Sequence, residues 1–129
     1  MINEPTLTYT SQGNVLHRAK LQSTDIHANS ETATAIVSEC IADAEAEINL
    51  ITRKPDGWTG SEEHYTSIQA AATNLAASYL FEQDLAALAS GRVSREVTVQ
   101  RSTELYNRAM AILNKLSQKL HIATTEEDD

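Results

Sequence analysis

The sequence has few of the residues that build covalent cross-links, large ligand pockets and phosphate-binding loops. Cys40 is the single cysteine among 129 residues, which excludes an internal disulfide. Aromatic residues make up 5% of the chain, which disfavours a large aromatic-lined pocket. The four glycines form no phosphate-cradling loop. No apolar run approaches the roughly 20 residues of a membrane span, and no secretion signal is recognisable, so we expect no membrane partner.

Basic residues are also scarce. Ten Lys and Arg face eighteen Asp and Glu, for a formal net charge of -8, which argues against a general nucleic-acid binder. The four histidines are scattered and show no HExxH or EF-hand spacing. A small bundle enzyme would need convergent polar residues on the inner faces of two helices, whereas the expected inner faces are apolar. We therefore predict a non-enzyme that uses no cofactor and no metal.

What the sequence has in abundance is helical periodicity. The longest helical pattern runs from 61 to 90 and is rich in alanine, so we expect a central helix that neighbouring helices approach closely. Ser61 is the predicted N-cap and Gly91 the predicted stop. The expected buried stripe has the three-and-four spacing of one helix face and consists of Tyr65, Ile68, Ala72, Leu75, Ala76 and Tyr79.

Three further helices are expected around it, and they predict a mainly α fold, a small helical bundle. A short helix follows Thr10 or Ser11, and a helix from Glu31 to about Arg53 is capped by Asn29 or Ser30. The last helix starts near Ser102. The stripes expected to be buried are Ala33, Val37, Cys40, Ile41, Ala44, Ile48 and Ile51 in the second of these helices, and Leu105, Ala109, Ile112, Leu113, Leu116 and Leu120 in the last.

One segment has a different period. VSREVTVQ, residues 93–100, alternates in strict two-residue steps, which predicts a short β-strand or hairpin arm between the last two helices. A lone strand leaves backbone groups without partners. It would pair with the extended arm at 1–9, lie at a solvent-exposed edge, or pair with another copy of the chain.

Two further features suggest contacts. Residues 1–120 are expected to form one helical domain with an N-terminal arm, and 121–129 form an acidic C-terminal arm that ends in four carboxylates. Trp58, the only tryptophan, lies in the breaker sequence KPDGWTG. The favoured interpretation is that it packs this loop on the domain; the alternative is an anchor for a partner.

The order of these parts resembles a known family. The segments YTSQGNVL, AEAEINLITRK, LAASYLFEQ, VSREVTVQ and LYNRAMAILNKL, with the loop of Trp58, resemble the head-to-tail adaptor (connector) proteins of tailed viruses, from about Tyr9 to Leu120. The resemblance implies a ring of the chain's own copies, a dodecamer, in the neck of the virion below the portal. Such a ring is made in the host cytoplasm, lines the genome channel and joins the head to the neck or tail.

The resemblance also implies sites and partners. The partners are the portal protein and the next neck or tail-completion protein, while genome DNA passes through the lumen without sequence-specific binding. The subunit contact would fall on Val93, Arg95, Val97 and Val99, and the portal contact on His121, Ile122, Thr124, Glu126, Glu127, Asp128 and Asp129. The alternative is a non-viral soluble helical interaction or regulatory protein that acts as a monomer or dimer.

Overall fold

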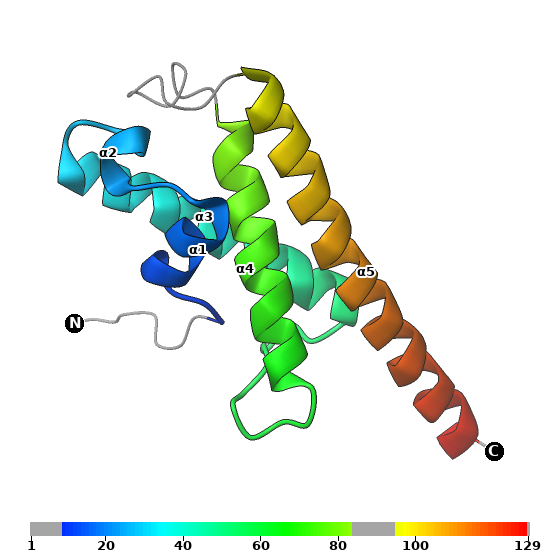
Figure 1. Cartoon of the computed structure of the whole chain (residues 1–129). Coiled ribbons are helices and arrows are strands. Elements are labelled where there is room, and N and C mark those ends of the chain that lie inside the picture. Colours follow the sequence, from blue (N-terminus) through cyan, green and yellow to red (C-terminus); the bar gives the residue numbers. More distant parts are fainter. Residues whose placement is uncertain (1–8, 84–94, 129) are drawn as a thin grey trace, which may run out of the picture.

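The computed structural model describes residues 9–83 and 95–128, with backbone alone for 95–97 and 120–128. The described residues form helices and contain no strand, so the predicted mainly helical bundle is confirmed (Figure 1). The helices are α1 (Gln12–Ala19), α2 (Ser23–Ile26), α3 (Ser30–Thr52), α4 (Tyr65–Glu82) and α5 (Arg95–Asp128).

Helix α4 lies at the centre of the bundle and packs against α1, α3 and α5 (Figure 1). Its residues from Ala71 to Ser78 are all buried, because small side chains allow neighbouring backbones to approach on several sides. Ser78 Oγ donates a hydrogen bond of 3.0 Å to the carbonyl oxygen of Ser102 in α5. This bond lies in the buried interface between the two helices, which run antiparallel with Ser78 level with Ser102.

The ends of α1 and α3 follow the predicted capping chemistry. Ser11 Oγ accepts from the backbone N–H of Asn14 at 3.1 Å, and Asn29 Oδ1 accepts from that of Thr32 at 2.9 Å. Helix α3 ends where Arg53 takes a left-handed conformation with φ of 59°. The predicted stripes of α3 and α5 are largely buried, with Ile51 and Ile112 half-buried at their margins. The side chain of Leu120, the last residue of the predicted α5 stripe, is not among those described.

The predicted strand is wrong. From Arg95 onward the segment is the start of α5, while Val93 and Ser94 lie outside the described residues. An alternating run also contains residues four apart, which is a helical spacing. Since the described part of the chain has no strand to pair with, a helix satisfies the backbone groups locally. The last helix therefore starts at Arg95 and not near Ser102.

The predicted start of α4 is also wrong. The helix begins at Tyr65, with His64 at the N-cap, and not after Ser61. Glu62 instead accepts a hydrogen bond of 2.8 Å from the backbone N–H of Thr59 and forms an ion pair with Lys54. Those bonds hold the residues before Tyr65 in a turn. The predicted end of α4 is wrong as well, because the helix ends at Glu82 and Gln83 has an extended backbone. Gly91, the predicted stop, lies outside the described residues.

Candidate functional site

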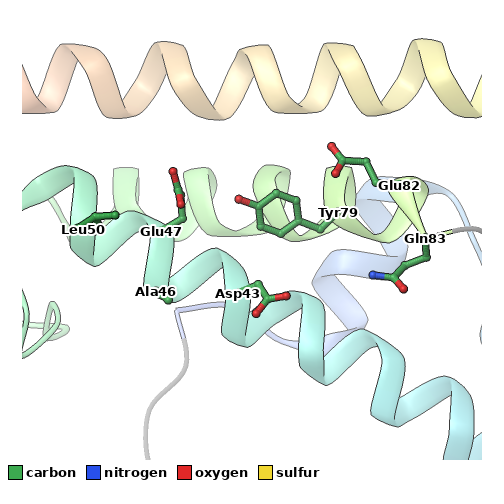
Figure 2. A pocket seen from close by; sticks show the side chains of 7 residues that line it. All are labelled: Asp43, Ala46, Glu47, Leu50, Tyr79, Glu82 and Gln83. Atoms are coloured by element: carbon green, nitrogen blue, oxygen red, sulfur yellow. The ribbon is translucent and has the colours of Figure 1, made fainter.

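An open groove of about 660 Å³ lies between α3 and the C-terminal part of α4. Figure 2 shows its side chains, with α5 running alongside. Its lining, which we call the acidic groove, consists of Asp43, Ala46, Glu47, Leu50, Tyr79, Glu82 and Gln83. Two consecutive turns of α3 supply the first four of these residues, because positions 43, 46, 47 and 50 share one face of a helix.

The groove is strongly negative. It holds the carboxylates of Asp43, Glu47 and Glu82 around the ring of Tyr79. Burial, and then the negative charge of Glu47, raise the pKa of Tyr79 to about 12. Its phenol therefore keeps its proton at neutral pH. Among the side chains that the structure describes, the one ion pair joins Lys54 to Glu62, so the groove's acids are not neutralised by a described base.

Exposed apolar side chains border the same groove. Leu50, at 75% exposure, is the most exposed large hydrophobic residue of the described chain, followed by Val99 at 59% and Tyr106 at 40%. Tyr106 lies close enough to Tyr79 to contribute to its raised pKa, which places Tyr106 on the groove side of α5. Val99 precedes Tyr106 by seven residues and so lies on the same side of that helix. Carboxylates beside apolar surface suit a partner with long basic side chains.

The opposite side of α5 carries mostly cations, together with one exposed acid, Glu104, one helical turn before Arg108. Arg101 turns toward α1, where its guanidinium donates to the carbonyl oxygen of Ala19 at 3.4 Å and lies 6.0 Å from the ring centre of Phe81. Continuing along this side at helical spacing are three exposed cations, which we call the basic edge: Arg108, Lys115 and Lys119. The bundle therefore carries opposite charges on two sides of one helix.

A second polar cluster fastens the start of the described chain to α3. The hydroxyl of Tyr9 donates to Asn49 Oδ1 at 2.6 Å and accepts from the backbone N–H of Trp58 at 2.8 Å. The indole of Trp58, 6% exposed, donates to Thr52 Oγ1 at 3.0 Å. Glu45 accepts from the backbone N–H of Tyr9 at 2.7 Å. Trp58 thus packs its loop on the domain, which leaves little of it for a partner.

No protein-family model, curated protein or solved structure matches the chain.

The residues predicted to form the subunit contact are only partly placed. Val93 lies outside the described residues, and Arg95 and Val97 belong to the first turns of α5, where backbone alone is described. Val99 is exposed on the groove side of that helix. Of the predicted portal contact, residues 121–128 continue α5, and Asp129 lies outside the described residues.

The described residues show neither a metal-binding cluster nor an activated thiol. They contain no group of three or more His, Cys, Asp or Glu side chains able to hold a metal ion. Cys40 is buried in the core, and burial raises the pKa of its thiol to about 11, which keeps it protonated and unreactive at neutral pH. None of the described helices meets the length and hydropathy needed to cross a membrane.

The sequence analysis did not predict the groove, because Asp43, Glu45 and Glu47 lie opposite the buried stripe of α3 and acids at such positions usually form a solvated helix face. The sequence offered one weak signal, since Leu50 lies outside the buried stripe, one turn beyond Glu47 on the acidic side. A single apolar residue on a helix surface is common, so this signal did not identify the groove by itself. Glu45, also assigned to that face, is instead half-buried against Tyr9.

Proposed function

We propose that the protein is a structural virion protein, a head-to-tail adaptor that forms a ring beneath the portal and joins the head to the neck or tail. The observation that carries the proposal is the length of α5 relative to the bundle. At about 1.5 Å per residue, its 34 residues span roughly 51 Å, against roughly 27 Å for the 18 residues of α4.

The excess length lies at the C-terminal end. Because Ser78 pairs with Ser102 in an antiparallel arrangement, the first residue of α4, Tyr65, lies level with Lys115. Leu116 is the last buried residue described on α5. Beyond it the helix leaves the bundle, and Figure 1 shows its C-terminal end projecting past α4. A helix whose backbone projects past the other helices that the structure describes suits insertion into another protein.

The charge of that end favours a basic acceptor. The last turn of α5 contains Glu126, Glu127 and Asp128 and no basic residue, although the C-terminal end of a helix is its negative pole. Cations supplied by another protein would remove this repulsion. We therefore assign residues 121–129 to portal docking, as the family resemblance implies.

The support for ring formation comes from the distribution of charge on the surface and not from the β-strand that the sequence predicted. Backbone groups from Arg95 onward lie within α5, so strand pairing between copies is not part of the proposal. The chain still presents two unlike surfaces, the acidic groove and the basic edge, and unlike surfaces on one chain allow a head-to-tail ring. A net charge of -8 also suits a channel wall past which DNA slides, since acidic walls do not retain phosphates.

One observation favours the second candidate, a soluble helical regulatory protein that acts as a monomer or dimer. The described core closes within one chain, with Ile68, Leu75, Leu80 and Leu113 fully buried, so folding does not require a ring. That protein would use the groove for a transient partner and would ignore a portal.

Solution mass with and without the cognate portal ring separates the two candidates. The adaptor is expected to bind the portal in many copies, and deletion of residues 124–129 is expected to weaken that binding while the thermal midpoint stays within a few degrees. The matched control removes four exposed acids elsewhere, as many as the deletion does, by Glu31→Gln, Glu39→Gln, Asp56→Asn and Glu63→Gln. A chain that stays monomeric and ignores the portal would refute the adaptor assignment, and unchanged binding after the deletion would refute the role of the C-terminal end.

A further inference from the structure

We infer that the acidic groove of one copy receives the basic edge of α5 from the next copy, so that neighbouring subunits are joined by a helix-in-groove contact. The inference rests on the proposed ring and identifies the surfaces that would close it. It names a second copy of this chain as the occupant because the complementary surface is present on the same molecule.

The two surfaces face away from each other. Tyr106 marks the groove side of α5, and nine residues at about 100° per residue bring Lys115 to the opposite side of the helix. Arg101, seven residues before Arg108, contacts Ala19 and so shows that the basic edge continues the α1 side of the bundle. One copy therefore offers its groove on one flank and its basic edge on the other.

The surfaces match in charge and spacing. Asp43 and Glu47 lie one helical turn apart in the groove, and Lys115 and Lys119 lie one turn apart on the edge. Within the described side chains none of these four takes part in an ion pair. Two parallel or antiparallel helices could thus align two acid–base pairs at once, which a single exposed pair could not hold in place.

The surfaces also match in apolar area. Leu50 stands 75% exposed at one end of the groove, and half-buried Ile112 lies on the basic edge between Arg108 and Lys115. The aliphatic stems of the lysines add apolar surface beside it. Contact would remove the most exposed large hydrophobic residue of the described chain from water, a contribution that ionic screening does not weaken.

This geometry decides the symmetry. A two-fold contact requires one self-complementary patch, whereas groove and edge occupy opposite flanks, so each copy that binds one neighbour leaves its other surface free for the next. The contact is head-to-tail, and it closes into a ring or continues as a filament depending on the rotation between copies.

Charge exchange between copies tests the inference. The groove variant carries Asp43→Lys and Glu47→Lys, and the edge variant carries Lys115→Glu and Lys119→Glu. Each alone has like charges on both surfaces and is expected to lose self-assembly, with at least about a 100-fold weaker association. An equimolar mixture is expected to recover assembly, because each variant's reversed surface then meets an opposite charge.

Two controls accompany the mixture. The first control is a chain with all four substitutions, which should assemble with itself. The second is the double variant Asp56→Lys with Glu63→Lys, which changes the net charge as much as the groove variant does but at exposed loop positions. It should assemble like the unaltered chain. Native mass spectrometry at low salt measures the oligomers, and circular dichroism confirms that each variant is folded. Assembly of the unaltered chain should also weaken at 1 M salt, where screening acts over about 3 Å.

The outcomes separate this inference from the proposed function. Recovery in the mixture but in neither single variant supports the groove-to-edge contact. Assembly that persists in both single variants, or fails to return in the mixture, overturns it while leaving the adaptor proposal standing. An unaltered chain that assembles by this contact but ignores the portal overturns the adaptor proposal alone, and one that is monomeric at every concentration, with and without the portal, overturns both.

Discussion

Removing the hydroxyl of Tyr9 tests whether the cluster around Trp58 stabilises the fold. In Tyr9→Phe the backbone N–H of Trp58, buried at 2.8 Å from that hydroxyl, loses its acceptor. An unsatisfied buried donor costs about 1 to 3 kcal/mol, and the lost bond to Asn49 adds about 0.5 to 1.5 kcal/mol. We expect a total loss of about 2 to 3 kcal/mol, since Asn49 is half-buried and regains part of its bond from water.

That loss converts to a shift of about 7 to 11 °C in thermal midpoint, from an unfolding entropy of about 2.1 cal/mol/K per residue. Thermal and urea unfolding followed by circular dichroism measure it. The matched control is Tyr65→Phe, because Tyr65 packs edge-on against Tyr9 with ring centres 6.0 Å apart and is half-buried; its change should stay within about 0.5 kcal/mol. Equal effects of the two substitutions would refute the reasoning.

Two further predictions concern the core of α3. Ile41 is 6% exposed, so Ile41→Ala should lower the free energy of unfolding in urea by about 2 to 5 kcal/mol. Leu50 is 75% exposed, so Leu50→Ala should lower it by less than about 0.5 kcal/mol. Similar losses for the two variants would mean that the buried face of α3 was misassigned. Burial raises the pKa of Cys40 from 9.0 to about 11, so the folded chain binds more protons than the unfolded chain between these values. The stability contributed by the neutral thiol is complete below pH 9 and is lost as the pH rises through about 11. The free energy of unfolding should therefore fall less steeply between pH 8.5 and 10.5 in Cys40→Ala than in the unaltered chain. An unchanged slope would exclude Cys40 as a source of the pH dependence.

The candidate site shows how far sequence reasoning reaches. Periodicity identified the buried faces of α3 and α5 because burial of residues three and four apart is a local property of a helix. The groove was not predicted, since it requires knowing that Tyr79 of α4 and Tyr106 of α5 lie on the same side of the bundle as Glu47. That arrangement depends on how helices far apart in sequence pack together.

The segment 95–100 shows the reverse case, in which a clear local pattern gave the wrong element. Alternation predicted a strand, but a strand needs a partner that the described chain does not supply. A helix satisfies its own backbone bonds, and Ser102 anchors this one to Ser78. Tertiary packing thus outweighed the two-residue pattern.

The sequence by itself determined the helical class and the apolar stripes, and it narrowed the two caps to Thr10 or Ser11 and to Asn29 or Ser30, because each of these features follows from neighbours within a turn or two of the chain. Only the tertiary structure decided where α5 begins, that Trp58 is held by Tyr9 and Thr52, and that acids and bases lie on opposite flanks of one helix. These features depend on contacts between residues distant in sequence, whose geometry is set when the helices pack.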